Sequence, residues 1–186
     1  YPMISSVEEV RAANLILEEC KRELDAEGVS YSNELQKGIM VEIPSAAIAA
    51  DLIADEVDFF SIGTNDLIQY TCAVDRMNEK ISGLYNPFNP AVLRLIKNVI
   101  DAAHDNGIWC GMCGEAAADS RLIPLYLGMG LDEFSMSAGS MLKARKLISG
   151  LSYEKMQIMS RDALKIKTSD DIIAFLAENS APKFNI

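Results

Sequence analysis

Short apolar runs alternate with longer amphipathic segments along most of the chain. Five runs have the length and composition of β-strands, and they cover residues 2–5, 39–43, 57–62, 108–113 and 133–137. Because strands that alternate with helical segments usually form a parallel sheet, this order predicts an α/β fold. The largely apolar run over 57–62 suits a strand covered on both faces. The pattern is compatible with an open sheet and with a closed barrel.

The segments between these runs carry the start and stop signals of helices. Ser6 and Glu9 form a capping-box pair ahead of an apolar stripe that ends near Gly28. Pro44 suits the first turn of a helix, because a missing amide hydrogen is harmless there. Helices are therefore predicted from Ser6 to about Gly28, over 46–55, over 67–73, from Asn89 and Pro90 to 106, over 120–127, and from 141 onward, with Ser169 as the cap of the last one.

Composition limits the classes of function. The chain has 186 residues, of which 49% are apolar, so it can bury one substantial core. Its formal net charge of −10 argues against a surface for nucleic acid or for an anionic membrane. No apolar stretch approaches the roughly 20 residues of a membrane helix, and the amino end lacks a secretion signal, so we expect a cytoplasmic protein. The four cysteines follow no framework spacing and are expected to be reduced.

Three reactive side chains come directly after predicted strands. Glu42, Asp66 and Cys113 each stand where an apolar run gives way to proline, glycine or polar residues. In α/β folds ligands bind at the carboxyl ends of the strands, so this recurrence predicts one site with two carboxylates and a thiol. The long irregular connection over 75–89 carries Arg76, and connections of that length inside compact domains are often functional.

Five motifs give the chain a resemblance to a known family. They are Gly-Ile-Met-Val-Glu-Ile-Pro (38–44), the segment over 59–70 that contains Gly-Thr-Asn-Asp, Ala-Val-Asp-Arg (73–76), Trp-Cys-Gly-Met-Cys-Gly-Glu (109–115) and Gly-Leu-Asp-Glu-Phe-Ser-Met-Ser (130–137). In this order they resemble the phosphoenolpyruvate-binding domain of enzyme I of the bacterial sugar phosphotransferase system. Pyruvate phosphate dikinase and phosphoenolpyruvate synthase share three of these elements and stay open as alternatives, although Val-Asp-Arg favours enzyme I.

The resemblance implies a partial (β/α)8 barrel of the TIM type. The chain would supply the last five of eight strands and the carboxyl-terminal helices, so residues 1–186 would be a carboxyl-terminal fragment of the phosphoenolpyruvate-binding domain. The parent enzyme transfers the phosphoryl group of phosphoenolpyruvate to a protein histidine and yields pyruvate, as the first step of sugar uptake. The fragment would lack two phosphate-binding arginines and the acceptor histidine, so we expect it to be inactive alone. Its unpaired strand edges should make it self-associate.

The family's functional residues correspond to positions of this chain. Glu42 and Asp66 would bind Mg²⁺, which prefers oxygen ligands. Asn65, Asp66 and Arg76 would bind the substrate, with backbone amides at a helix start assisting at the phosphate. Cys113 would be catalytic, because a thiol facing the methylene carbon can exchange a proton with enolpyruvate. The implied partners are phosphoenolpyruvate or pyruvate, a second copy in a homodimer, and a phosphocarrier protein that binds through the absent amino-terminal domain.

Structural roles stay open for the same residues. By spacing alone, Glu42 is a polar strand end and Asp66 a helix cap. Arg76 is then a solvated loop residue, and Cys113 a small buried side chain like most free cysteines. A non-catalytic fragment for substrate binding or dimerisation is therefore an alternative to the enzyme fragment, and Mg²⁺-dependent substrate binding separates the two.

A thiol-disulfide oxidoreductase is a further alternative, because Trp-Cys-Gly-Met-Cys (109–113) imitates the thioredoxin active-site string. In that fold Cys110 and Cys113 open a helix, where residues three apart share a face. If 108–113 is instead a strand, the two cysteines point to opposite faces with Cα atoms about 10 Å apart, beyond the roughly 7 Å limit of a disulfide. The conformation of this segment therefore decides between the two functions.

Overall fold

A four-stranded parallel sheet forms the centre of the structure. The computed structural model describes residues 1–180, and in that part of the chain the strands lie in the order β1, β2, β3, β4. Each strand pairs with the next one along the chain. The result is an α/β fold that is consistent with part of an α/β barrel. The strands are β1 (Gly38–Val41), β2 (Phe59–Gly63), β3 (Trp109–Cys113) and β4 (Glu133–Phe134).

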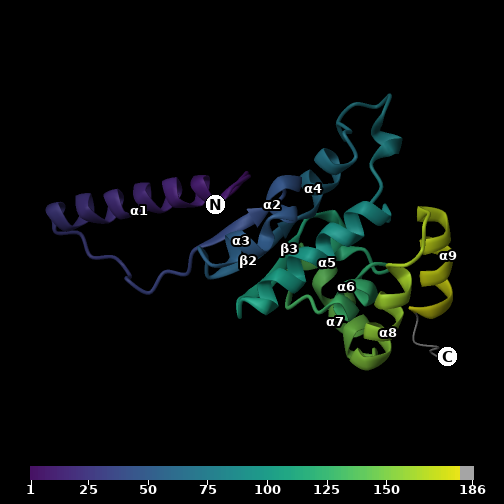
Figure 1. Cartoon of the computed structure of the whole chain (residues 1–186). Coiled ribbons are helices and arrows are strands. Elements are labelled where there is room, and N and C mark those ends of the chain that lie inside the picture. Colours follow the sequence, from purple (N-terminus) through teal and green to yellow (C-terminus); the bar gives the residue numbers. More distant parts are fainter. Residues whose placement is uncertain (181–186) are drawn as a thin grey trace.

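Helices precede, connect and follow the strands (Figure 1). Parallel neighbours require such crossovers, because a tight hairpin turn can join only antiparallel strands. The helices, in chain order, are α1 (Val7–Glu27) before β1; α2 (Pro44–Ile48) and α3 (Ala50–Ala54) after it; α4 (Thr64–Thr71), the 3₁₀ turn η1 (Ser82–Leu84) and α5 (Pro90–Asp105) after β2; the 3₁₀ turn η2 (Glu115–Ala118) and α6 (Ile123–Met129) after β3; and α7 (Ala138–Ser149), α8 (Tyr153–Ala163) and α9 (Ser169–Asn179) after β4.

The sequence signals account for the ends of two long helices. The Ser6 side chain caps α1 by accepting a hydrogen bond from the Glu9 amide, and Gly28 ends the helix with a left-handed φ of 71°. Asn89 caps α5 in the same way by accepting a hydrogen bond from the Ala91 amide at 2.8 Å. Both predicted starts are therefore confirmed.

The bounds of several predicted elements differ from the structure. The helix expected over 46–55 is two short helices, because Ala49 adopts φ −96° and ψ 25° between them. Thr168 rather than Ser169 caps α9, since the Thr168 side chain accepts an amide hydrogen bond from the first turn. The strand expected over 133–137 contains two paired residues. In each case the element type is correct and its extent is set by local contacts.

The amino end is not a strand, which corrects the prediction for residues 2–5. Tyr1 makes both bonds of a single parallel bridge to β1. Its amino group donates to the Gly38 carbonyl at 2.7 Å, and its own carbonyl accepts from the Met40 amide at 2.8 Å. Met3 then has a φ of 57°, a left-handed value that ends the extended conformation. Tyr1 thus lies beside the outer edge of β1 without continuing the sheet.

Helices cover one face of the sheet and leave the other partly exposed. On β2, Phe60 and Ile62 are fully buried toward α5, which packs on β2 and β3. The alternate positions Phe59 and Ser61 are only partly buried. The Trp109 ring stacks on Phe59 with 4.5 Å between ring centroids, and Trp109 is 37% exposed. The expectation that β2 is covered on both faces is therefore wrong for the described residues.

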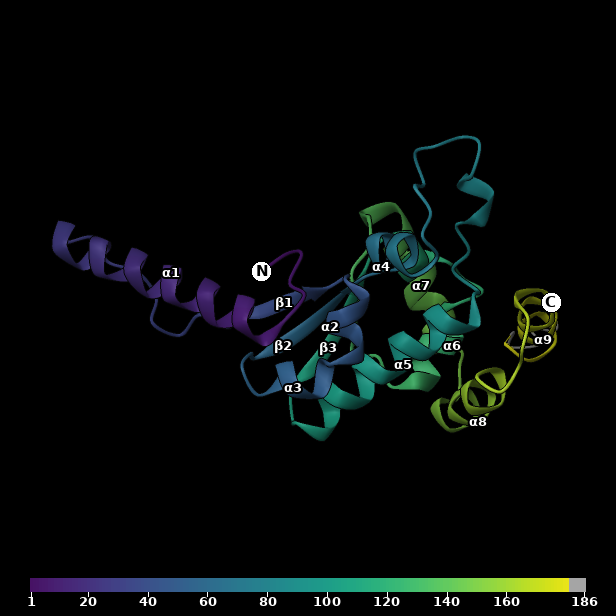
Figure 2. The ribbon, with the colours of Figure 1, turned by 45° about the horizontal axis from the view of Figure 1, so that its top comes forward.

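α1 projects away from the sheet (Figure 1, Figure 2). Val10 is the buried residue of this helix, whereas Leu15 and Ile16 are 71% and 63% exposed. α1 therefore contributes little to the core, which extends from the sheet and α5 to α2, α3, α6, α8 and α9. Nowhere in residues 1–180 does a helix combine the length and apolar character needed to cross a bilayer.

Candidate functional site

The predicted site residues lie at the carboxyl ends of three neighbouring strands. Glu42 follows β1, Asn65 and Asp66 are in the first turn of α4 directly after β2, and Cys113 ends β3. The strand register pairs Gly63 with Cys113. Glu42 lies against the same glycine, because a Cβ built on Gly63 would be 2.7 Å from Glu42 Oε2. We call this edge, formed by Glu42, residues 63–66 and residues 113–115, the carboxyl rim.

Two hydrogen bonds join the β2 and β3 ends of the carboxyl rim. Thr64 Oγ1 donates to the Cys113 carbonyl at 2.8 Å, and the Glu115 amide donates to Asn65 Oδ1 at 3.1 Å. Gly114 lies between them with a φ of 93°, and a Cβ there would collide with Thr64 Oγ1. Both the left-handed backbone and the lack of space require glycine at this position. The turn after Cys113 is therefore held against Asn65.

These contacts determine which way the Asn65 amide points. A backbone amide only donates, so the Asn65 atom beside the Glu115 nitrogen has to be the acceptor oxygen. The Tyr85 hydroxyl donates to the same oxygen at 3.4 Å. Burial, followed by the nearby Glu115 charge, raises the pKa of Tyr85 to about 12, so this hydroxyl keeps its proton at neutral pH. The donor side of the Asn65 amide consequently faces away from both groups, which suits it to an anion.

Cys113 is half-buried on the partly exposed face of the sheet. Burial raises the pKa of its thiol, and the Glu42, Glu133 and Asp66 carboxylates raise it further, while a hydrogen bond with Ser61 acts in the opposite direction. The thiol is therefore protonated at neutral pH and can donate a proton. Its pKa also responds to carboxylates from β1, α4 and β4, so the structure brings Glu42 and Asp66 into the neighbourhood of Cys113.

Cys110 and Cys113 cannot form a dithiol pair in this fold. Both belong to β3, where Cys110 is fully buried on the helix-covered face and Cys113 lies on the other face. All four cysteines of the chain fall within the described residues, and all are free. Because strand residues three apart point to opposite sides, the oxidoreductase alternative is excluded.

The two predicted metal ligands differ in their surroundings. Glu42 is 7% exposed, and its Oε1 accepts a hydrogen bond from the Met3 amide at 2.8 Å. Asp66 lies in the first turn of α4 and is partly exposed. Across residues 1–180, no three or more His, Cys, Asp or Glu side chains are grouped so as to hold a metal ion. Glu42 and Asp66 each offer carboxylate oxygens, the type of ligand that hard cations prefer.

Arg76 lies in the long connection between α4 and α5. The connection begins with a turn in which Ala73 has a left-handed φ of 51°, and the Arg76 amide donates to Gln69 Oε1 at 3.1 Å. The Arg76 guanidinium Nη1 lies 3.9 Å from Glu115 Oε1. This ion pair connects the loop with the carboxyl rim, so Arg76 stands beside the other predicted site residues.

Two adjoining hollows open at the rim and share Glu115. The larger, of about 500 Å³, is lined by Asn65, Cys113, Gly114, Glu115, Ala118, Ser135, Met136 and Ser137. The smaller, of about 270 Å³, is lined by Arg76, Met77, Ser82, Tyr85 and Glu115. A ligand in the larger hollow would lie against Cys113, and the smaller hollow beside it contains Arg76.

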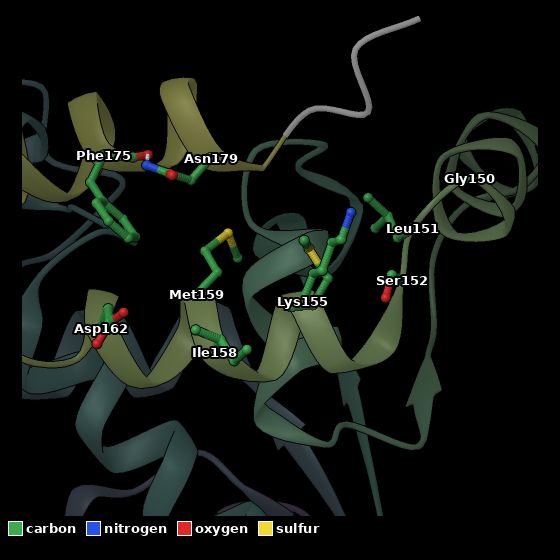
Figure 3. Close-up of a pocket in the computed structure, with 10 residues that line it drawn as sticks. Gly150, Leu151, Ser152, Lys155, Ile158, Met159, Asp162, Phe175 and Asn179 are labelled. Atoms are coloured by element: carbon green, nitrogen blue, oxygen red, sulfur yellow. Dashed lines mark hydrogen bonds between the residues drawn. The ribbon is translucent and has the colours of Figure 1, made fainter.

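Another hollow, of about 640 Å³, lies between α8 and α9, away from the strand ends (Figure 3). We call it the α8–α9 groove. Lys155 and Asp162 of α8 and Phe175 and Asn179 of α9 are among its lining residues. Asn179 Nδ2 donates to the Phe175 carbonyl at 2.8 Å, so part of its polar surface is already satisfied within α9.

Sequence reasoning missed four residues of the site: Ser61, Glu133, Tyr85 and Glu115. The period of two along β2 could have identified Ser61, because it shares a face with Gly63, the partner of Cys113. Glu115 belongs to a motif that was recognised, but its ion pair depends on the loop. Tyr85 carries no sequence signal, since its contact with Asn65 depends on how the loop over 75–89 folds back.

A family model described as PEP-utilising enzyme, PEP-binding domain, matches residues 1–153. PEP denotes phosphoenolpyruvate. The chain belongs to this family. The matched span includes the whole carboxyl rim and Arg76, so the family resemblance inferred from the motifs is confirmed.

Curated relatives carry the name phosphoenolpyruvate-protein phosphotransferase. The protein of Enterococcus faecalis is 58% identical over 179 residues, which are 96% of this chain and 31% of the relative. That of Staphylococcus carnosus is 54% identical over 178 residues, with 96% and 31% covered. That of Listeria monocytogenes is 53% identical over 181 residues, with 97% and 32% covered. The chain thus spans a little under a third of the length of these PEP-utilising relatives.

Proposed function

We propose that residues 1–186 are the carboxyl-terminal part of the phosphoenolpyruvate-binding barrel of a phosphoenolpyruvate-protein phosphotransferase. The parent protein would transfer the phosphoryl group of phosphoenolpyruvate to a protein histidine. The names of relatives at 53–58% identity support this assignment. The observation that carries it is the convergence of Asn65, Cys113 and the Glu42 and Asp66 carboxylates at one rim, with Arg76 beside them. In this proposal β1 to β4 and the Tyr1 segment correspond to the last five of eight barrel strands.

The phosphate of the substrate binds between Asn65 and Arg76. The Asn65 oxygen is occupied by the Glu115 amide and the Tyr85 hydroxyl, so its Nδ2 is the atom available to a phosphate oxygen. Amides at the start of α4 add further donors, since the amino end of a helix favours anions. Arg76 supplies a charge-assisted contact.

Glu42 and Asp66 hold the Mg²⁺ of the parent enzyme. When bound, Mg²⁺ would add to Arg76 in neutralising the phosphate's negative charge at a rim that carries several carboxylates. The Met3 amide orients the Glu42 carboxylate through its 2.8 Å hydrogen bond. Asp66 follows Asn65 in the chain, which supports a metal ligand close to the phosphate donor.

Cys113 moves the proton. When the bond between the bridging oxygen and phosphorus breaks and the phosphoryl group joins a histidine nitrogen, the electron pair stays on the oxygen and the enolate of pyruvate remains. The Cys113 thiol then gives its proton to the methylene carbon, which yields pyruvate and a thiolate. The raised pKa of Cys113 keeps the thiol protonated before the transfer and makes the thiolate a strong base for the reverse reaction.

The acceptor histidine lies outside this chain. His104 is the single histidine of the sequence and belongs to the last turn of α5, which leads to the amino end of β3. Its Nε2 is bonded to Asp132 Oδ2 at 2.8 Å. His104 is therefore at the opposite end of the strands from Cys113, and we expect the isolated chain to be inactive.

From the family we also propose that the parent protein is cytoplasmic and homodimeric, and that a phosphocarrier protein binds to another of its domains.

Titration calorimetry of the full-length parent protein with phosphoenolpyruvate tests the proposal. Binding should require Mg²⁺ and should weaken at least about tenfold in Asp66→Asn, since both the metal and the phosphate contact depend on that carboxylate. Asp51→Asn is the matched control, because Asp51 is exposed on α3 away from the rim. Equal affinity with and without Mg²⁺, or in Asp66→Asn and the native protein, would refute the assignment.

A non-catalytic fragment is the second candidate for the isolated chain. The partly exposed sheet face with Phe59 and Trp109, and the exposed Leu15 and Ile16 of α1, favour association over function in isolation. Light scattering at tens of micromolar should give a mass above the 20.4 kDa of one chain. A well-behaved monomer would contradict the barrel-fragment interpretation.

A further inference from the structure

Arg76, which binds the substrate's phosphate in the proposed function, is paired with Glu115 in the structure. Arg76 Nη1 lies 3.9 Å from Glu115 Oε1, and the two side chains are 36% and 80% exposed. Glu115 lines both hollows of the rim, the one that contains Cys113 and the one that contains Arg76. The Glu115 carboxylate therefore competes for the positive charge of Arg76 with any anion that binds in the larger hollow.

The backbones of both members of this pair are held in place. Its backbone amide is bonded to Asn65 Oδ1 at 3.1 Å, and the preceding Gly114 is confined by Thr64. Arg76 is attached at its backbone to Gln69, while its long side chain can rotate. An exchange of partners therefore needs only side-chain rotation, and the backbone of the rim stays in place.

The environment of Tyr85 agrees with this arrangement. After burial, the causes that act on the raised pKa of Tyr85 are the charges of Glu115, Arg76 and Asp66, in that order. Three charged groups of the site thus lie around one hydroxyl that is itself bonded to Asn65. The arginine, its carboxylate partner and the phosphate donor form one connected group.

We propose that Glu115 is a positioning residue that holds Arg76 in the absence of substrate and competes with the phosphate of phosphoenolpyruvate for the guanidinium. This proposal rests on the proposed function of Arg76. A phosphate carrying close to two negative charges can displace the single charge of Glu115, whereas weaker anions are at a disadvantage. After the phosphoryl group has left, Arg76 returns to Glu115. The carboxylate thereby lowers affinity at the site and favours strongly charged ligands.

The expected effect is modest, because exposed ion pairs contribute little. Releasing Arg76 by Glu115→Gln should tighten phosphoenolpyruvate binding about two- to fivefold. Removing any acidic residue near an anion site could also tighten binding by reducing general repulsion. The experiment has to separate this long-range term from the competition for Arg76.

Calorimetry on the full-length parent protein with saturating Mg²⁺ and phosphoenolpyruvate makes the separation. The variants are Glu115→Gln, Arg76→Ala and the double variant, with Glu79→Gln as the matched control, since Glu79 is an exposed acid of the same loop. We expect Glu115→Gln to tighten binding about two- to fivefold in the native background and to have no effect in the Arg76→Ala background. Glu79→Gln should leave the affinity unchanged.

The other outcomes distinguish failure of the proposed competition from failure of the proposed role of Arg76. If Glu115→Gln tightens binding equally with and without Arg76, the effect is general repulsion and the competition is refuted. If Arg76→Ala weakens binding and Glu115→Gln changes nothing, the competition is refuted and the proposed role of Arg76 stands. If Arg76→Ala itself binds like the native protein, the role of Arg76 in the proposed function fails together with this inference.

Discussion

The carboxyl rim and the α8–α9 groove differ in volume and in the reactive groups that line them. The groove is the larger hollow, about 640 Å³ against about 500 Å³. At the rim, however, ends of successive strands bring a thiol with a raised pKa, an amide of fixed orientation and several carboxylates together. The groove is formed by α8, α9 and the turn before α8, and in it Asn179 Nδ2 is already bonded to the Phe175 carbonyl. Converging strand ends, rather than volume, indicate where chemistry takes place.

Replacing Cys113 tests the reactive role of the carboxyl rim and should have the largest effect on the rate. In the full-length parent protein, Cys113→Ala should lower the rate of pyruvate formation by about 10²- to 10⁴-fold, because the methylene carbon loses its proton donor. Phosphoenolpyruvate affinity should stay close to native, since binding depends on Asn65, Arg76 and the metal ligands. A coupled assay of pyruvate release measures the rate. Unchanged rates in both directions would remove Cys113 from the mechanism.

A substitution where α6 packs on α8 should change the stability of the protein rather than its activity. A Cβ at Gly128 of α6 would collide with the Met156 carbonyl of α8, so Gly128→Ala should lower the free energy of unfolding by about 1–3 kcal/mol. Gly139→Ala is the matched control, because nothing lies within 4 Å of the added Cβ in α7. It should be neutral or stabilising by up to about 1 kcal/mol. Urea unfolding followed by circular dichroism compares the two, and equal midpoints would contradict the tight α6–α8 contact.

The pH dependence of Cys113 alkylation tests whether the pKa of this thiol at the carboxyl rim is raised. Burial and three carboxylates disfavour the thiolate and raise the pKa, so alkylation should rise only above the usual thiol range near pH 8.5. Iodoacetamide labelling, read at the Cys113 peptide by mass spectrometry, gives the midpoint against N-acetylcysteine. Glu133→Gln should shift the midpoint downward, because one of the neighbouring negative charges is removed. A midpoint at or below that of the free thiol would show that the thiol is not enclosed as described.

The smallest expected effect belongs to the α8–α9 groove. Lys155→Gln removes a cation from the wall of that groove and should leave phosphoenolpyruvate affinity within about twofold, as for most surface changes away from a site. Calorimetry under the conditions used for the rim variants provides the measurement. A large loss of affinity would mean that the groove takes part in substrate binding and would end the distinction drawn above.

Local signals predicted much of the fold and the positions of the site residues. The start of α5 follows from Asn89 and Pro90, and the strand character of 109–113 follows from a short apolar run after a helix stop. Period and composition could not reveal that one sheet face is partly exposed, because an apolar strand looks the same whether or not a second layer covers it. The single bridge of Tyr1 depends on its contact with β1 rather than on its own residue type.

The contacts within the site were harder to predict than its members. The bond between Tyr85 and Asn65 and the pair of Arg76 with Glu115 bring together residues 20 and 39 positions apart, through a loop without regular periodicity. Residue types at strand ends can be read from motifs, but the path of a loop is set by packing against the finished sheet. The roles of Tyr85 and Glu115 therefore required coordinates.

The stacked pair of Phe59 and Trp109 provides an optical reporter. The chain contains a single tryptophan, so its intrinsic indole emission arises from one known place. That indole is on the strand that ends in Cys113 and is 37% exposed to water. Any partner, strand or second copy that covers this surface and excludes water from the indole should shift its emission to shorter wavelength. No added label is needed. Fluorescence can thus follow the closing of the sheet's open side in real time.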